Sequence, residues 1–185
     1  MANVVAATVA HFGSVDILVN NAAIASELVP GPFEASTADE WRRILDVNVV
    51  GTFLMCRAVA PHMRARQWGR IVNVGSGTAF KGLPGLAHYV ASKGAIIMLT
   101  RTLANELGAD NVLVNVVSPG LTMTEAVMAN DRITETFGPK AIATRAIKRD
   151  AQSIDVANVI YFFTTEEAAF VTGQNLAADG GSVFH

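Results

Sequence analysis

The stretches RIVNV at residues 70–74 and VLVNVV at residues 112–117, with a long helical pattern at 86–107 between them, decide the fold. Both short runs are rich in β-branched residues, which favour strands. The segment between them is long and apolar enough to cross over as a helix. A strand, a helix and a second strand in this order are typical of a parallel βαβ unit, so the stretch predicts a parallel sheet.

The same alternation continues on both sides of this unit. DILVN at 16–20 predicts a strand buried on both faces, and residues 37–66 predict a helix that begins with a capping box of Thr37 and Glu40. Further along, the patterns predict a short helix at 154–164 and a fourth strand at 174–178. Four parallel strands with helices between them define one open α/β domain.

Three other segments complete this outline. Residues 1–13 are typical of the end of a helix that leads into the first strand, and Gly108 is expected as the C′ residue that ends the helix at 86–107. Residues 122–150 are more polar and carry scattered charges, so we interpret them as a mobile flap of short helical segments.

Composition excludes several classes of protein. The 185 residues are 51% hydrophobic and 16% charged with a net charge of −2, which argues against a disordered chain and against a nucleic-acid partner. We find no signal peptide, no membrane span and no metal-ligand spacing. Cys56 is the only cysteine, and its apolar neighbours predict a buried, unreactive thiol, as suits a cytoplasmic protein.

The candidate chemistry begins with Tyr89 and Lys93, which are four residues apart and therefore share one face of the predicted helix. A phenol is a poor acid or base at neutral pH, but a nearby ammonium favours the phenolate and lowers the phenol's pKa. Because chance pairs with this spacing are common, the pair alone is as well explained by an exposed lysine beside a packing tyrosine.

Two other positions favour a catalytic role for this pair over the packing explanation. Ser76 follows the strand at 70–74 in a glycine-rich loop, and ligands bind at the carboxyl ends of strands in open α/β sheets. Asn48 lies inside the predicted helix, where asparagine is unfavourable, and such departures from local preference are expected at functional sites. Taken singly, Ser76 could simply cap the backbone and Asn48 could mark a kink.

At this point the sequence resembles the classical short-chain dehydrogenase/reductase family. The resemblance covers essentially the whole chain and rests on six motifs in the family's order: NNAA (20–23), DVNVVGTF (46–53), GRIVNVGS (69–76), YVASK (89–93), SPGLTMT (118–124) and VTGQNLAADGG (171–181). It implies a Rossmann-like parallel sheet with helices on both faces, and an enzyme that interconverts a ketone and a secondary alcohol with NAD or NADP.

The resemblance also implies residue roles. Tyr89 would be the general acid/base, Ser76 would hold the substrate carbonyl, and Lys93 would bind the nicotinamide ribose and lower the pKa of Tyr89. Asn48 would anchor a proton-relaying water. The remaining cofactor-binding positions would be Asn20 and Ala22 beside the adenosine ribose, and Pro119, Gly120, Leu121, Thr122 and Thr124 along the nicotinamide, its carboxamide and the phosphates.

The sequence departs from the family in three places. Ala23 replaces the last glycine of N-N-A-G and would be strained if its φ were positive. Gly75 stands where a second serine is common, and Ser76 keeps its spacing to Tyr89. The glycine-rich T-G-x-x-x-G-x-G segment does not occur in the 185 residues, so we expect an N-terminally truncated Rossmann-like domain in which the strand at 16–20 is an edge.

A missing phosphate-binding turn has a measurable consequence. We expect the 185-residue chain to bind NAD(P)H poorly and to turn over slowly unless a partner completes the sheet, since a cofactor held weakly is not positioned for reaction. Tight binding of NAD(P)H in a calorimetric titration would contradict this. An in-frame glycine motif in the coding DNA upstream of Met1 would instead indicate a wrongly assigned start.

Several alternatives remain open at this level. The chain could be a catalytically silent member of the family that acts as an oligomerisation or binding module, although all four catalytic positions are filled. By resemblance, the helices at 37–66 and 86–107 would build a homodimer or homotetramer. Small and aliphatic side chains at 78–88 and 122–150 favour an apolar ketone, alcohol or acyl chain. The choice between NAD and NADP is open.

Overall fold

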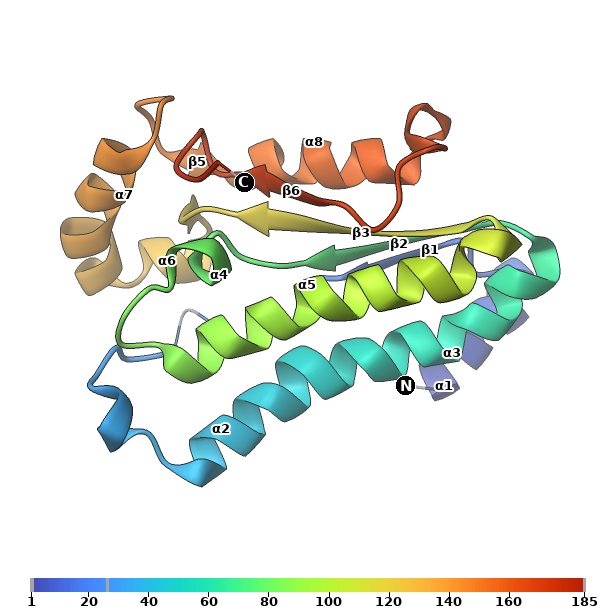
Figure 1. Ribbon diagram of the computed structural model, residues 1–185, viewed down its shortest axis with the longest axis horizontal. Helices are drawn as coiled ribbons and strands as arrows, with labels where there is room; N and C mark the ends of the chain where they lie inside the picture. The colour runs from blue at the N-terminus through green and yellow to red at the C-terminus, as the bar shows by residue number, and fades with distance from the viewer. Residues whose placement is uncertain (1, 26, 185) are drawn as a thin grey trace.

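The protein is built on a four-stranded parallel sheet in the order β1-β2-β3-β6 (Figure 1). The computed structural model describes residues 2–25 and 27–184. The strands are β1 (Ile17–Asn20), β2 (Gly69–Val74), β3 (Val112–Pro119) and β6 (Asn175–Ala178). All four predicted strands are thereby confirmed, and their carboxyl ends meet at one edge of the sheet.

Helices cover both faces of the sheet, as predicted. On one face, α1 (Ala2–Phe12), α3 (Gly51–Arg66) and α5 (Ala87–Leu107) enclose a core that includes Val59 and Val114 (Figure 1). On the other face, α8 (Ser153–Thr164) packs over β2 and β3 around Phe163. Helix α1 begins at Ala2 and confirms the predicted N-terminal helix. Met1 lies outside the described residues.

The predicted helix at 37–66 is one continuous helical run with an irregular centre. It consists of α2 (Ala38–Leu45), the π-helical turn η2 (Asp46–Val50) and α3, and it begins with the predicted capping box of Thr37 and Glu40. The run Ala38–Arg66 is long and apolar enough to cross a membrane by length and composition. Its inner side chains, such as Met63, are buried against the sheet, and the core helix of a globular domain meets the same criterion.

The helix predicted at 86–107 ends at Leu107, directly before Gly108, as predicted. Gly108 has φ −61° and not the left-handed conformation typical of a C′ glycine, so the chain continues into the 3₁₀ turn η3 (Gly108–Asp110). The left-handed residue is Asn111, with φ 57°, whose short side-chain amide tolerates this conformation.

The segment at 122–150 contains the short helical pieces that its composition predicts. They are α6 (Glu125–Met128), η4 (Arg132–Phe137) and α7 (Gly138–Thr144). A second sheet, which the sequence did not predict, pairs β4 (Thr122–Met123) with β5 (Ala151–Gln152). The remaining short elements are η1 (Phe33–Ala35), the single turn α4 (Thr78–Lys81) and η5 (Glu166–Ala168).

Strand β1 lies at the edge of the sheet, as expected. Leu18 is buried in the core under α1 and α3, whereas its neighbours Ile17 and Val19 point to the opposite face and are 47% and 41% exposed. Among the strands of this sheet, helix α8 packs mainly against β2, β3 and β6. Both the outer edge of β1 and one of its faces are therefore open to solvent.

Candidate active site

The structure places the four predicted catalytic residues around the carboxyl end of β2. Ser76 follows β2 by two residues, Tyr89 and Lys93 lie one turn apart near the start of α5, and Asn48 lies in η2. Ser76, Lys93 and Asn48 are buried and Tyr89 is half-buried. Contacts with the sheet and with neighbouring loops fix each of these side chains.

Lys93 is a buried ammonium group without a carboxylate partner. Its Nζ donates a hydrogen bond to the carbonyl oxygen of Val74 (2.8 Å) and lies 5.7 Å from the centre of the Tyr89 ring. The ion pairs between described residues do not include it. Burial lowers the pKa of Lys93 to about 8, and an ammonium has three donors, so donor capacity remains for a ligand.

Tyr89 holds its proton more tightly than a free phenol. Burial raises the pKa of Tyr89, and a hydrogen bond with Ser76 acts in the opposite direction with a smaller effect. The sequence led us to expect that Lys93 would lower this pKa, but in the structure burial dominates because the phenolate would be poorly solvated. At neutral pH the site therefore presents a protonated phenol, which is an acid.

Ser76 lies between this phenol and the glycine-rich loop. Its Oγ accepts hydrogen bonds from the backbone N–H of Thr78 (3.2 Å) and from the Thr78 hydroxyl (2.9 Å). Gly75 beside it has a packing reason, since a Cβ there would lie 2.5 Å from the Oγ of Ser118. A second serine at position 75 would not fit without movement of β3.

Asn48 ties together three segments that surround the site. Its Oδ1 accepts from the Ile24 N–H (2.8 Å), and its Nδ2 donates to the Ile24 carbonyl (3.2 Å) and to Ser92 Oγ (3.1 Å). The π-helical turn at Asp46–Val50 explains the unfavourable asparagine inside the helix, since such turns are frequent at functional sites. The amide positions α5 one residue before Lys93, and the predicted bound water stays a prediction.

The predicted ribose-binding residues lie at the end of β1. Asn20 directs its amide into the sheet, where Nδ2 donates to Asn73 Oδ1 (2.8 Å) and lies 3.4 Å from Cys56 Sγ. Ala22 is exposed, and Ala23 is not among the described residues with positive φ, so it carries no strain. Cys56 is 1% exposed and burial raises its pKa to about 11, which confirms a buried, unreactive thiol.

The predicted nicotinamide-binding segment runs from the end of β3 into the flap. Pro119 ends β3, Gly120 donates its N–H to Ala178, and Leu121 leads into β4. The Thr122 hydroxyl donates to the carbonyl of Gly120 (3.1 Å), whereas Thr124 Oγ1 caps α6. Both hydroxyls lie close to the carboxyl edge of the sheet.

Sequence reasoning missed two residues that hold this edge together. Ser92 is fully buried beside Asn48, and its place within the YVASK motif was the only indication of a role. Arg145, which is 3% exposed, had no sequence indication at all.

A third residue, Asp179, belongs to a structural turn that the sequence DGG at 179–181 predicts after the last strand. Its carboxylate accepts three backbone N–H groups of residues 181–183, which explains how this turn is held.

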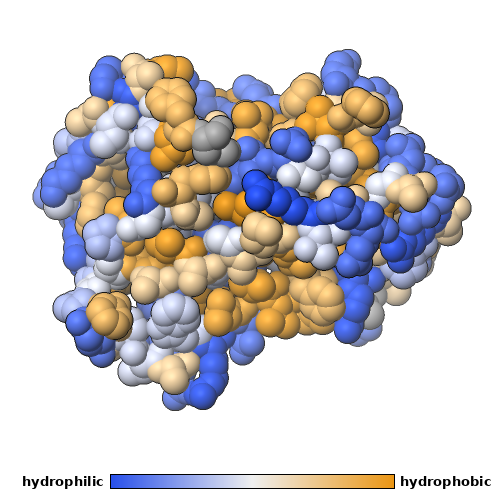
Figure 2. All heavy atoms as spheres, in the orientation of Figure 1, coloured by the Kyte–Doolittle hydropathy of each residue, from blue (hydrophilic) through white to orange (hydrophobic). Residues whose placement is uncertain are grey.

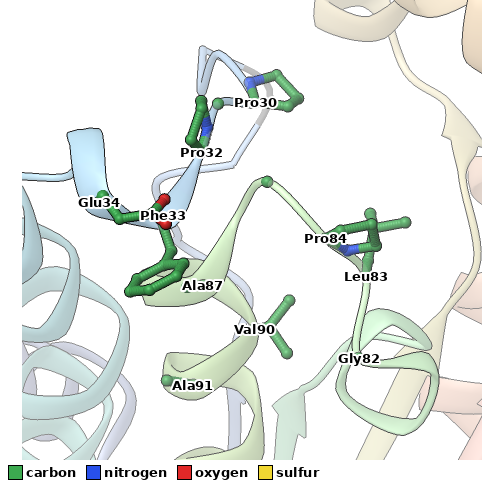
Figure 3. A pocket seen from close by; sticks show the side chains of 12 residues that line it. Pro30, Pro32, Phe33, Glu34, Gly82, Leu83, Pro84, Ala87, Val90 and Ala91 are labelled. Atoms are coloured by element: carbon green, nitrogen blue, oxygen red, sulfur yellow. The ribbon is translucent and has the colours of Figure 1, made fainter.

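A cavity of the described chain lies beside the reaction centre without including its residues. It measures about 930 Å³ and lies between the loop at 30–34 and the start of α5 (Figure 3). Val90 and Ala91 line it, but none of the four predicted catalytic residues does. It includes residues 82–85 and 87 of the segment expected to shape the substrate pocket and none from 122–150. Ligands in open α/β sheets bind at the carboxyl ends of the strands, where the four predicted catalytic residues lie. No group of three metal-ligating side chains occurs among the described residues.

The buried lysine has a consequence for stability. Between about pH 8 and pH 10 the unfolded chain, in which a lysine has a pKa near 10.4, binds more protons at this position than the folded chain. The free energy of unfolding should therefore rise with pH in this window, by up to about 1.4 kcal/mol per pH unit. Below pH 8 the cost of the buried ammonium is fully present.

Urea unfolding at several pH values measures this slope. Lys93→Met, which keeps the stem and removes the ammonium, should lack the rise that the wild-type protein shows. The raised pKa of Tyr89 makes the free energy of unfolding fall with rising pH, but only above about pH 10. It therefore does not affect the comparison between pH 8 and pH 10. Equal slopes for the two proteins would show that Lys93 is not desolvated.

Comparison with known proteins agrees with this geometry. A family model described as enoyl-(acyl carrier protein) reductase matches residues 1–183. A 3alpha-hydroxysteroid dehydrogenase of Mediterraneibacter gnavus is 39% identical over 172 residues, which cover 93% of this chain and 66% of that protein. A 3-oxoacyl-(acyl carrier protein) reductase of Staphylococcus epidermidis is 34% identical, with 94% and 68% covered.

A solved structure titled "ElxO with NADP Bound" superposes with a TM-score of 0.91 at 30% identity, and the match covers 98% of this chain and 72% of that one. The chain thus belongs to the short-chain dehydrogenase/reductase family. It spans about two thirds of the length of the curated relatives that it matches.

Proposed function

We propose that the protein carries the proton-transfer site of an NAD(P)-dependent oxidoreductase that interconverts a ketone and a secondary alcohol. The observation that carries this proposal is the cluster of Ser76, Tyr89 and Lys93, in which a protonated phenol lies beside a serine hydroxyl and a buried ammonium 5.7 Å from the centre of its ring. Reduction of a carbonyl needs a group that donates a proton to the developing alkoxide, and a buried phenol with an intact O–H is suited to this step.

Each side chain of the cluster would have its own role in the reaction. Ser76 would hold the carbonyl oxygen, and the Tyr89 O–H would transfer its proton to that oxygen while Lys93 stabilises the phenolate that remains. A bound nicotinamide cofactor would supply or accept the hydride at the substrate carbon. The donors around Lys93 fit its ribose hydroxyls, and the segment from Pro119 to Thr122, with Thr124, would hold the nicotinamide and phosphates.

The substrate class follows from the walls and from the relatives. Leu83 and Pro84 line the cavity beside the start of α5, and Met123 and Val127 of the flap are apolar. The relatives include a hydroxysteroid dehydrogenase, 3-oxoacyl-(acyl carrier protein) reductases and an acetoacetyl-CoA reductase. These names support a small or extended apolar ketone or alcohol as the proposed substrate.

An assay with paired cofactors tests the proposal. The purified protein is incubated at millimolar NADH or NADPH with a panel of apolar ketones and 3-oxoacyl thioesters, and the alcohol product is identified by mass spectrometry. Deuterium from 4-deuterated cofactor should appear on the carbinol carbon. Absence of any deuterated alcohol from a folded protein that binds the cofactor would favour the alternative of a catalytically silent binding module.

We further propose that the protein is a homodimer or homotetramer. Apolar side chains gather over α3 and α5 (Figure 2), and the exposed ones on this helical surface include Val47, Val50, Phe53 and Met98. An exposed apolar patch of this kind is typical of a protein–protein interface. Analytical ultracentrifugation should detect the oligomer, and a stable monomer at micromolar concentration would contradict it.

A further inference from the structure

The flap at 122–150 is closed at its base. Its first residues form β4 and pair in parallel with β5, which follows its last residue, so that Thr122 lies opposite Ala151 and Met123 opposite Gln152. The two-residue ladder is short, and a pair of strands of this length has little stability by itself. Other contacts must therefore hold the two ends together.

Arg145 makes such a contact. Its Nη1 donates to the carbonyl oxygen of Arg149 (2.7 Å), and its Nη2 donates to the carbonyl oxygen of Leu121. These two acceptors stand at opposite ends of the flap, 28 residues apart in the chain. One buried guanidinium therefore bridges the start and the end of the segment.

The side chain of Arg145 packs against two glycines, Gly120 and Gly180. A Cβ on Gly120 would lie 3.6 Å from Nη2 of Arg145, and one on Gly180 would lie 3.4 Å from its Cδ. Directly after Arg145, the backbone N–H groups of Ala146 and Ile147 donate to the carbonyls of Gly181 (3.2 Å) and Gly180 (2.9 Å). The side chain is thus enclosed between the end of β3 and the turn that follows β6.

The charge of Arg145 has no carboxylate partner within ion-pair distance in the described parts of the chain. A buried cation is costly unless hydrogen bonds compensate it. An apolar residue would fill the same space without that cost, but it could not bond to two carbonyls. The planar fork of guanidinium donors can reach acceptors on two different segments, which explains an arginine here.

We propose that Arg145 is a positioning residue that clamps the two ends of the flap. The clamp fixes the carbonyl of Leu121 and hence the segment that carries Thr122. Its consequence for catalysis rests on the proposed function, because this segment would hold the nicotinamide.

Hydrogen exchange followed by mass spectrometry tests the clamp without substrate or cofactor. In Arg145→Met, amides in 121–124 and 145–152 should exchange at least about 10-fold faster, since exchange reports local opening. Amides of β2 and of the first half of β3 should keep their wild-type rates. Arg149→Met is the matched control, because it removes the exposed ion pair with Asp155 and leaves the Arg149 carbonyl in place. It should change the same amides by less than about 3-fold.

The conservative variant Arg145→Lys distinguishes the effect of the two guanidinium hydrogen bonds from the effect of the positive charge. Arg145→Lys keeps the charge but loses the planar fork, so its exchange rates should lie between those of the wild type and Arg145→Met. Wild-type exchange at both ends of the flap in Arg145→Met would overturn the proposal, as would acceleration that is uniform over the central strands.

If the wild type reduces a ketone, Arg145→Met should raise KM for cofactor and substrate more than it lowers kcat. Wild-type KM values in a variant whose flap ends exchange faster would overturn the catalytic consequence and leave the clamp standing. A wild type that lacks turnover would count against the proposed function, and the exchange result would still decide whether the clamp exists.

Discussion

Replacement of Tyr89 by phenylalanine is expected to lower carbonyl reduction by about 10²–10⁴-fold, the usual contribution of a positioned acid or base. The substitution removes only the hydroxyl and keeps the ring, which is half-buried beside Lys93. The fold should therefore be retained, while the proton that the carbonyl oxygen needs is no longer available. The rate is followed as consumption of NAD(P)H at millimolar cofactor and equal protein concentration.

The chain offers a matched control, because it has two tyrosines. Tyr161 lies on α8 and is 70% exposed, so Tyr161→Phe removes the same atom away from the site and should leave the rate unchanged. Equal loss in both variants would indicate a general effect on the protein. An unchanged rate in Tyr89→Phe would assign the proton transfer to another group.

Replacement of Asp179 by alanine is expected to lower the free energy of unfolding by about 3 kcal/mol, since buried donors that lose a charged acceptor are costly. The Asp179 carboxylate is 2% exposed and accepts the backbone N–H groups of Gly181 (3.0 Å), Ser182 (3.1 Å) and Val183 (3.0 Å). It holds the turn at Gly180 and Gly181, both of which have positive φ. Urea unfolding followed by circular dichroism measures the change.

An amide at the same position refines this prediction. In Asp179→Asn, the oxygen that replaces Oδ1 still accepts from Gly181 and Ser182, but the NH₂ group no longer accepts from Val183. The loss should therefore be smaller, about 1 kcal/mol. A loss in Asp179→Asn as large as that in Asp179→Ala would show that the charge matters and not the count of hydrogen bonds.

Much of the fold could be predicted from the sequence because the periodic signals are strong. β2 and β3 are short runs rich in β-branched residues, and the capping box of Thr37 and Glu40 marks the start of a helix. The end of α5 at Leu107 was predicted correctly, but the left-handed residue is Asn111 and not the glycine that usually takes this conformation after a helix. The β4–β5 pair is too short to leave a periodic pattern.

The residues of the candidate site could be proposed from the sequence, whereas the direction of the Tyr89 pKa shift could not. Spacing placed Tyr89 and Lys93 on one helix face, and the poor helix propensity of Asn48 indicated an irregularity where the structure has a π-helical turn. The direction of the Tyr89 pKa shift depends on burial, which spacing does not reveal. Arg145 was missed because its two acceptors are backbone carbonyls, which any sequence provides.

The strand order of the main sheet bears on how the chain is made. In β1-β2-β3-β6 each strand pairs with the previous strand of the sheet, so synthesis delivers the strands in the order in which they associate. Domains emerge from the ribosome at about 5–20 residues per second, with the N-terminal part first. The sheet can therefore grow in one direction during translation, with α3 and α5 each in place before the next strand arrives. Its last step is the arrival of β6, which brings the turn at Asp179 to the carboxyl end of β3.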